Sequence, residues 1–415
     1  MVRVCDMIMG AGKTSAAITQ MLEDEDSHYI YITPYLDEVA RVKTACSDRD
    51  FYEPTDDNGR KIDDLHRLLE AKRNIVSTHA LFKAYTEETM QLIRDGGYKL
   101  IMDEVADVVQ KIDVHKDDIN MMLGQGLIQV DELGCVQWVD DVYDGRFSGN
   151  FKGMCMTGHV FLYGEYLMLW TFPVGVFAAF REVTVLTYLF DAQIQKYYFD
   201  LHGIATKKIG TVKVNGVYRF TDTVRVPDYV ATLREKVHVL DNKKMNSIGK
   251  GQFDLSVAWY ERSSATRGKP KIEQLRKNVY NFYRNISKTP SARNLWTTYK
   301  NYEDALSGKG YSKGFLAFNA RATNEYRDRT HLAYCVNAFY NPFMKSYFQS
   351  NDIAVEEDKW ALSEMIQWVW RSAIRDGRDI WLYIPSVRMR TLLLDWLDEQ
   401  AEMVERQKVS LDECV

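Results

Sequence analysis

A short glycine-rich segment near the start of the chain has the residue types that hold phosphate groups. It reads Gly10-Ala11-Gly12-Lys13-Thr14-Ser15, with a short apolar stretch before it and a helical pattern after it. Glycines let backbone N–H groups turn toward phosphate oxygens, the lysine reaches the β- and γ-phosphates, and the threonine hydroxyl ligates Mg²⁺. The segment therefore predicts an ATP site in which these six residues bind the nucleotide and Thr14 also binds the metal. The alternative is a glycine-rich turn with a solvated lysine.

Two adjacent carboxylates, about 90 residues further on, have the chemistry that such a site still needs. Asp103 and Glu104 come directly after the apolar run 100–102. A strand there would carry both carboxylates to the carboxyl edge of a sheet, where nucleotides bind in α/β folds. We expect Asp103 to contact Mg²⁺ and Glu104 to act as the base that polarises the attacking water. The alternative is a solvated acidic helix start.

The elements that must position these groups alternate between strand and helix along the first half of the chain. This alternation predicts a parallel α/β sheet. An irregular region over 107–180 is expected to be an insertion, and 209–220 a hairpin with Asn215-Gly216 as its turn. The expected strands are 2–9, 28–33, 74–77, 98–102, 183–189, 295–298, 315–318, 332–336 and 380–384. The main expected helices are 36–46, 81–94, 271–286, 361–375 and 389–403.

Composition excludes several classes of protein. The chain has 415 residues, 46% of them hydrophobic and 27% charged, which is a globular profile of two or three domains. Its six cysteines form no CxxC pair, so neither a zinc ribbon nor a disulfide framework is supported. The longest apolar run, 166–180, is shorter than the ~20 residues that span a bilayer. We expect a cytoplasmic protein without a membrane role.

A basic segment stands out in a chain whose net charge is −5. Between residues 262 and 300 there are ten basic side chains, Arg276, Lys277 and Arg284 among them, against one acidic side chain. Aromatic residues lie between them in the sequence. Basic side chains follow phosphates and aromatic rings stack on bases, so the segment predicts contact with a nucleic acid. The alternative is a solvated basic helix whose aromatic residues belong to the core.

Three polar residues near the C-terminal end have helical spacing. Gln367, Arg371 and Arg375 are each four residues apart, so on one helix they would share a face. An arginine that reaches the γ-phosphate from a second lobe stabilises the charge of phosphoryl transfer. The alternative is a solvated amphipathic face.

At this point the chain resembles the superfamily 2 DEAD/DEAH-type helicases, most of all those of bacteriophages and prophages. The run Asp103-Glu104-Val105-Ala106 resembles the box that gives the family its name. Residues 31–35, with Thr33 and Pro34, lie where motif Ia is expected, and Ser77-Thr78-His79 resembles the next strand-end contact of the family. Further runs resemble motifs III, IV, V and VI, in this order: 186–190, 295–299 with Thr297, 319–326 with Thr323 and Asn324, and 367–375.

The resemblance implies two RecA-like lobes with parallel sheets, over residues 1–205 and 206–415. It implies an insertion in the first lobe and a helical basic segment at the start of the second. By this resemblance the residues of motifs Ia, IV and V and the strand end Ser77-Thr78-His79 contact the nucleic-acid backbone. Glu104, Gln367, Arg371 and Arg375 are then catalytic, with Arg375 favoured as the arginine finger. Two departures concern motif VI, where Trp370 replaces a glycine and Arg375 comes one residue late.

The function expected is that of an ATP- and Mg²⁺-dependent helicase or translocase in phage or prophage DNA replication. Its partners would be DNA, single-stranded or forked, in preference to RNA. A single-strand-binding protein or another replisome component is expected as a protein partner, in the cytoplasm of the host. Two alternatives stay open: a nucleic-acid-binding replication factor with little or no unwinding activity, and a P-loop ATPase or kinase of another class.

Overall fold

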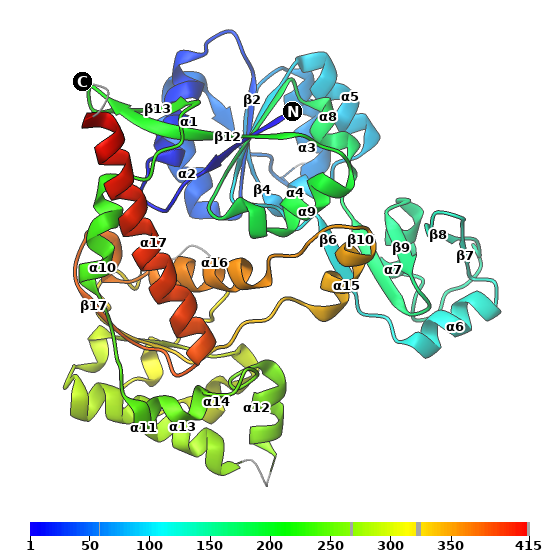
Figure 1. The fold of residues 1–415 in the computed structure, drawn as a ribbon. Helices are drawn as coiled ribbons and strands as arrows, with labels where there is room; N and C mark the ends of the chain where they lie inside the picture. Colours follow the sequence, from blue (N-terminus) through cyan, green and yellow to red (C-terminus); the bar gives the residue numbers. More distant parts are fainter. Residues whose placement is uncertain (58, 266–268, 321–324, 413–415) are drawn as a thin grey trace. The chain divides into compact units, whose positions relative to one another are not determined.

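The computed structural model describes residues 1–57, 59–265, 269–320 and 325–412. The chain divides into two compact units, each with its own parallel sheet and helices (Figure 1). The first unit contains Met1–Asp6, Lys13–Asp222 and Asn341–Val355, and the second contains Met7–Gly12, Thr223–Tyr340 and Glu356–Val415. The predicted α/β class with parallel sheets is confirmed, as are the insertion in the first unit and the helical basic segment in the second.

An eight-stranded sheet organises the first unit, in the order β13-β12-β1-β11-β5-β2-β4-β3. Every neighbouring pair is parallel except β12 and β13. Parallel pairing brings the carboxyl ends of β1, β5, β2 and β4 to one edge. The strands are β1 (Val2–Asp6), β2 (Tyr29–Thr33), β3 (Phe51–Tyr52), β4 (Asn74–Thr78), β5 (Lys99–Asp103), β11 (Glu182–Thr187), β12 (Thr206–Val214) and β13 (Val217–Thr221).

The predicted hairpin is present and belongs to this sheet. Asn215 and Gly216 have φ values of 51° and 85°, which suit a two-residue turn between antiparallel strands. Because β12 pairs with β1, the hairpin extends the first sheet, and the compact unit ends at Asp222. A boundary between residues 205 and 206, as proposed from the sequence, would cut through this sheet.

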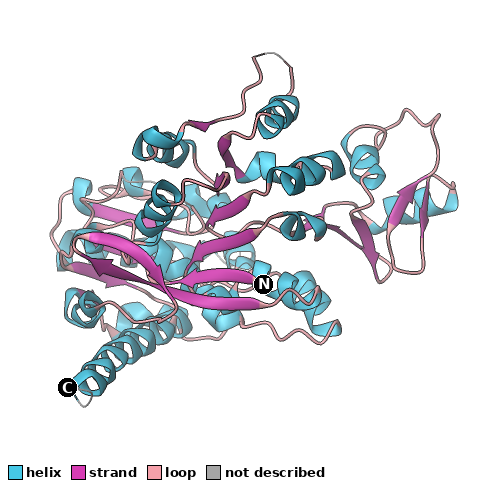
Figure 2. Cartoon of the chain, turned by 90° about the horizontal axis from the view of Figure 1, so that it is seen from above, coloured by secondary structure: helices cyan, strands magenta, loops and turns pink. Residues whose placement is uncertain are grey.

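Helices flank the strands on both sides (Figure 2). One expected helix, over 81–94, is two helices, because Thr86 starts a new one by accepting a hydrogen bond from the Thr89 N–H. The α-helices that cover this sheet are α1 (Lys13–Glu23), α2 (Leu36–Ala45), α3 (Lys61–Glu70), α4 (His79–Phe82), α5 (Glu87–Gly96), α8 (Gly175–Ala179) and α9 (Ile194–Leu201).

The region between β5 and β11 forms a separate module with two small antiparallel sheets, β6-β10-β9 and β7-β8. A helix from the second half of the chain, α15 (Pro342–Ser350), packs on it through the rings of Tyr163 and Tyr347 and a hydrogen bond from Tyr163 to Ser350. The module consists of β6 (Val109–Ile112), α6 (Lys116–Gly124), β7 (Ile128–Val130), β8 (Val136–Trp138), α7 (Asn150–Met156), β9 (Val160–Tyr163) and β10 (Leu167–Thr171).

The second unit has a four-stranded parallel sheet in the order β14-β17-β16-β15. The expected strand over 315–318 is only an isolated bridge from Phe315 to Trp296. The strands are β14 (Val237–Val239), β15 (Asn294–Thr297), β16 (His331–Tyr334) and β17 (Ile380–Tyr383). The helices are α10 (Leu233–Lys236), α11 (Lys243–Asn246), α12 (Val257–Ser264), α13 (Lys269–Asn281), α14 (Glu303–Leu306), α16 (Glu357–Val369) and α17 (Val387–Asp412).

Within the described ranges, the structure contains no helix whose length and apolarity would suit a bilayer crossing.

Candidate nucleotide-binding site

The glycine-rich segment lies where β1 ends and α1 begins. Gly10 and Gly12 have φ values of +87° and +81°, a left-handed conformation that glycine adopts without strain. A Cβ on Gly10 would come within 3.2 Å of the Tyr229 hydroxyl oxygen, so the position is also crowded. Lys13, Thr14 and Ser15 form the first turn of α1, which carries no acidic residue there. The positive end of this helix is therefore available to an anion.

Asp103 is the last residue of β5 and occupies an electrostatically unfavourable position. Burial, followed by the charges of Glu104 and Glu38, raises the pKa of Asp103 to about 7, while the Lys13 ammonium acts in the opposite direction. The two predicted ATP-site groups, the lysine and the carboxylate, are thus close enough to affect each other. A cation beside Asp103 would favour its ionised form.

Glu104 has an unusual backbone conformation for a side chain of its size. Its φ is +63°, and its N–H donates to the carbonyl of Leu186 on the neighbouring strand β11 at 2.9 Å. Strained conformations of this kind are held only where the surroundings fix them, and they occur often at active sites. The change of backbone direction at Glu104 allows its side chain to point differently from that of Asp103. The two expected roles, a base and a metal ligand, need such a difference.

The donor set at this edge fits Mg²⁺ and a triphosphate. Thr14 supplies a hydroxyl and Asp103 a carboxylate, both of which are hard oxygen ligands of the kind that Mg²⁺ prefers. Among the described residues, no group of three His, Cys, Asp or Glu side chains could hold a metal by itself. A cation bound here would need ligands from phosphate and water, as Mg²⁺ typically has.

The strand ends that were expected to contact nucleic acid lie at the same edge, on β2 and β4. Thr33 and Thr78 are neighbours in register. Thr33 is fully buried, and its hydroxyl has no hydrogen-bond partner within the described ranges. The prediction that its side chain contacts a polymer is therefore wrong for this conformation, whereas Pro34, Thr78 and His79 are partly exposed.

Two hydroxyl groups near these residues were not predicted to be of interest for the metal site. Tyr31 is buried in the middle of β2 and Thr187 at the end of β11, and the Thr187 hydroxyl has no hydrogen-bond partner among the described residues. Asp103 lies close enough to Tyr31 to raise the pKa of the phenol, after burial itself. Tyr31 is thus a further polar group beside the carboxylate. Tyr31 could not be singled out from the sequence, because it lies between Ile30 and Ile32 in a strand that was expected to be buried.

The arginine stripe of the second unit differs from the prediction. Helix α16 ends at Val369, and Ser372 has an extended backbone, so Gln367, Arg371 and Arg375 do not share one helix face. Arg371 is partly buried, and its Nε atom has no hydrogen-bond partner among the described residues. Arg375 is exposed on a 3-10 turn. Gln367 bonds within its own helix, from Nε2 to the Ser363 hydroxyl at 3.2 Å.

The glycine-rich loop contacts the segment that carries these arginines. Met7–Gly12 belongs to the second compact unit. The Tyr229 hydroxyl donates to the carbonyl oxygen of Met9 at 2.6 Å, and a Cβ on Gly10 would lie 3.7 Å from Cζ2 of Trp370. Trp370 directly precedes Arg371. The tryptophan that departs from the glycine of motif VI is therefore a contact of the loop, which no local sequence pattern could reveal.

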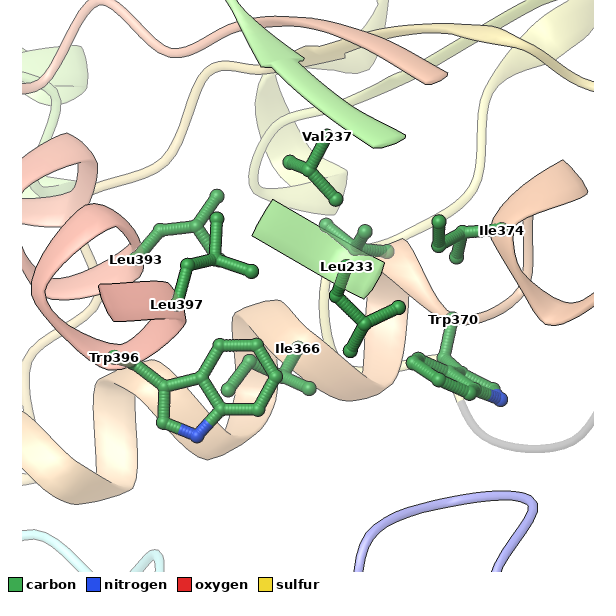
Figure 3. Close-up of a pocket in the computed structure, with 9 residues that line it drawn as sticks. Leu233, Val237, Ile366, Trp370, Ile374, Leu393, Trp396 and Leu397 are labelled. Atoms are coloured by element: carbon green, nitrogen blue, oxygen red, sulfur yellow. The ribbon is translucent and has the colours of Figure 1, made fainter. Parts of the chain in front are cut away.

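The inner side of Trp370 belongs to the core of the second unit. Together with Leu233, Ile366, Leu393 and others it surrounds an apolar recess (Figure 3). The cavity volume is about 10 Å³, which is at the limit for a single water molecule. The recess is thus a packing defect and not a ligand site. The apolar side chains that surround it hold Trp370, the tryptophan that contacts the loop, in its position.

The basic segment is a surface helix, α13, followed by one π-helical turn at Phe282–Ile286. Arg276, Lys277 and Arg284 are exposed, and none of them forms an ion pair with another described residue. Most of the interleaved aromatic residues are core, which corrects the prediction that they stack on bases. Phe282, Tyr283 and Trp296 are buried, and Tyr280, 38% exposed, is the exception.

Three expected backbone contacts in the second unit find no support. Thr297 is fully buried at the end of β15, so its side chain does not reach the surface. Thr323 and Asn324 lie outside the described residues.

Comparisons with known proteins give a family for the chain. Family models described as "YonV C-terminal Rossmann-like domain" and "YonV middle domain" match residues 231–397 and 109–170. The SPbeta prophage-derived protein YonV of Bacillus subtilis (strain 168) is 44% identical over 414 residues, which cover 96% of this chain and 99% of that protein. The middle-domain match coincides with the module formed by β6–β10.

Solved structures similar to this one have helicase titles. "XPD_Helicase" aligns with 97% of this chain and 95% of its own, at 9% identity and a TM-score of 0.46. "Crystal Structure of DUF1998 helicase MrfA bound to DNA" aligns with 92% of this chain and 46% of its own, at 11% identity and a TM-score of 0.30. At such values the likeness carries no argument about activity.

Proposed function

The chain belongs to the YonV family, and we propose that it is an ATP-dependent nucleic-acid helicase or translocase. The observation that carries the proposal is the edge of the first sheet. There the Lys13 ammonium, which directly follows the left-handed glycines of the loop in the sequence, lies close enough to the buried Asp103 carboxylate to affect its pKa. The combination matches the needs of a nucleoside triphosphate with Mg²⁺, and it comes from segments far apart in the sequence.

Each residue then has a defined task. The loop N–H groups and Lys13 would hold the phosphates, and Thr14 and Asp103 would hold Mg²⁺, which when bound would supply Lewis-acid stabilisation of the charge on the γ-phosphate. Glu104 accepts the proton of the attacking water. Arg371 offers a guanidinium whose Nε is buried and has no hydrogen-bond partner within the described part of the chain, and its neighbour Trp370 contacts the loop. These features favour Arg371 over Arg375 as the finger.

The polymer contacts belong to the same proposal. His79, Thr78 and Pro34 lie at the loop edge of the first sheet, and the exposed cations of α13 supply positive charge in the second unit. Contacts of this kind go to the phosphate backbone, so they predict binding without sequence preference. The relative named above is prophage-derived. We therefore propose that the activity serves phage or prophage DNA replication in the host cytoplasm. A single-strand-binding protein or another replisome component would be its protein partner.

ATP hydrolysis with and without a single strand tests the proposal. The purified chain is assayed with Mg-ATP alone, with poly(dT) and with poly(U), and Lys13→Ala serves as the inactive control. Stimulation by a strand that disappears in Lys13→Ala supports a helicase or translocase. Equal turnover with and without strands indicates a P-loop ATPase of another class. Strand binding without turnover indicates a replication factor that only binds nucleic acid.

A further inference from the structure

The glycine-rich loop begins with a tight turn over residues 8–11. The Ala11 N–H donates to the carbonyl oxygen of Ile8 at 3.2 Å, which closes a β-turn. Gly10, the third residue of this turn, has a φ of +87°, whereas Met9, the second, does not have a positive φ. These values are those of a type II turn, which favours glycine at its third position. Types I and II differ mainly by a flip of the central peptide, which here joins Met9 to Gly10.

A tyrosine of the second compact unit holds this central peptide in one orientation. The turn and Tyr229 belong to the same unit, and the Tyr229 hydroxyl donates to the carbonyl oxygen of Met9 at 2.6 Å. A flip of the peptide would turn this carbonyl away and break the bond. The same hydroxyl oxygen would lie only 3.2 Å from a Cβ at Gly10, so the phenol packs closely against both residues of the peptide. The contact therefore favours the observed orientation over the flipped one.

Tyr229 itself has a defined position in the second unit. It lies on a 3-10 helix over Asp228–Thr232, where the Thr232 hydroxyl donates to the Tyr229 carbonyl oxygen at 2.7 Å. The next residue, Val230, is buried, and the centroid of the Tyr229 ring lies 6.3 Å from that of Trp370. Because these contacts come from the second unit, that unit and not the loop sets the position of the hydroxyl.

The orientation of the central peptide decides what the turn offers to an anion. In a trans peptide the carbonyl and the N–H point in opposite directions, so a Met9 carbonyl directed at Tyr229 leaves the Gly10 N–H directed away from it. Gly10 is exposed, and its N–H has no hydrogen-bond partner among the described residues. Free N–H groups in turns of this kind bind anions. In the flipped orientation the carbonyl oxygen would take the place of the N–H and repel a phosphate oxygen.

We propose that Tyr229 is a positioning residue of the nucleotide site, which keeps the Gly10 N–H available to a phosphate oxygen of a nucleoside triphosphate. The inference rests on the proposed function, because it needs a phosphate at the loop. Tyr229 does not touch the phosphate and acts through the Met9 carbonyl. Because the N–H meets the phosphate equally before and during the reaction, Tyr229 affects the binding of the nucleotide and not the chemical step.

The test measures nucleotide affinity and turnover in Tyr229→Phe, which keeps the ring and loses the hydroxyl. Equilibrium binding of the fluorescent analogue mant-ATP with Mg²⁺ is measured in a Glu104→Gln background, where hydrolysis is expected to be slow. Loss of one neutral hydrogen bond should weaken mant-ATP binding about 2- to 10-fold. With Glu104 intact, KM for ATP should rise by the same factor, while kcat at saturating ATP stays within about twofold.

Tyr311→Phe is the matched control. The Tyr311 hydroxyl also donates to a carbonyl oxygen of the second unit, that of Leu306 at 2.7 Å, but its ring belongs to the core cluster that contains Ile272 and Val279 of α13. This variant should lose thermal stability and bind mant-ATP normally. Equal weakening of mant-ATP binding in Tyr229→Phe and Tyr311→Phe would overturn the inference, because the loss would then follow stability and not the loop.

The remaining outcomes separate the inference from the function on which it rests. Absence of mant-ATP binding in the protein with an intact Tyr229 would remove the proposed function. Binding by that protein, with equal affinity in Tyr229→Phe, would overturn only the inference. A fall of kcat in Tyr229→Phe without a rise in KM would also overturn it, since Tyr229 would then act on the chemical step. A rise in KM alone, with normal binding by Tyr311→Phe, is the result that supports the inference.

Discussion

His79 and Asp103 are joined directly: the Nε2–H of the imidazole donates to the main-chain carbonyl oxygen of Asp103 at 3.0 Å. A carbonyl oxygen can only accept, so this contact fixes the proton on Nε2. One residue is the proposed strand contact at the end of β4, and the other is the proposed Mg²⁺ ligand at the end of β5. A shift of the imidazole on strand binding would thus act on the backbone that positions the carboxylate.

His79→Ala should uncouple strand binding from hydrolysis. The substitution removes the bond to Asp103 while leaving the loop and both carboxylates in place. We expect basal ATP turnover to stay within about twofold and the stimulation by poly(dT) to fall at least about tenfold, since a positioned group can contribute that much. The measurement is the ratio of kcat with and without the strand. Full stimulation in His79→Ala would show that the contact plays no part in coupling.

Asp103→Asn should stabilise the fold while it abolishes turnover. Asp103 has a folded-state pKa of about 7 against an ordinary value of 3.8. Below pH 3.8 both states carry the proton, and between 3.8 and 7 the folded state retains a proton that the unfolded state has lost. The free energy of unfolding therefore falls as pH rises through this window, and the loss is complete above it.

Thermal unfolding in metal-free buffer at pH 4, 6 and 8 measures this effect. The amide has no charge to bury, so the variant should exceed the parent in Tm at pH 8 and approach it at pH 4. A Tm difference that is the same at all three pH values would contradict the burial of an ionisable Asp103.

Arg371→Ala should be more damaging than Arg375→Ala. The Nε of Arg371 is buried and has no hydrogen-bond partner among the residues that the structure describes. Arg375 is exposed beside Asp376, whose pKa it helps to lower after the larger effects of Arg327 and Arg378. Loss of an arginine finger costs roughly 10³–10⁵ in rate. Strand-stimulated kcat should fall by that order in Arg371→Ala and by less than about tenfold in Arg375→Ala, with ATP affinity retained in both. The reverse order would restore Arg375 as the finger.

Reversing the charges of Arg276, Lys277 and Arg284 to Glu should weaken strand binding and reduce its salt dependence. All three side chains are exposed on α13 and the π-helical turn, so the fold should tolerate the change. Each lost phosphate contact lowers the log–log salt slope by about 0.7 for a single strand. Affinity is measured from 50 to 300 mM salt, and a slope equal to that of the parent would leave α13 as a solvated surface helix.

The nucleotide edge could be predicted from sequence because its determinants are local. A strand, a glycine turn and a helix place Lys13, and an apolar strand that ends in two carboxylates places Asp103, so parallel pairing is the only further requirement. The basic face of α13 could also be predicted, because the excess of lysine and arginine over acidic residues can be counted in the sequence. The helical period puts Ile272, Leu275 and Val279 into the core, and the neighbouring aromatic residues follow them there.

Features that depend on distant contacts could not be predicted. Helix α16 ends at Val369, although its periodic pattern continues to Arg375, because Trp370 caps it and packs in the core recess of the second unit. Thr297 is a polar residue at the end of a strand, where exposure would be expected, and its side chain is nevertheless fully buried. The Tyr229–Met9 bond joins residues 220 positions apart. No pattern within one segment contains such information.

The central claim is that the nucleotide state and strand affinity are coupled, and one binding measurement tests it. Glu104→Gln keeps the shape of the site and loses the base, so it should bind Mg-ATP and hydrolyse it about 10²- to 10⁴-fold more slowly. The affinity of this variant for fluorescein-labelled dT20 is measured with Mg-ATP, with Mg-ADP and without nucleotide. The account predicts a difference of about 5- to 150-fold between the ATP and ADP states, the usual range for coupled sites. Equal affinity in all three states, with ATP shown to be bound, would contradict it.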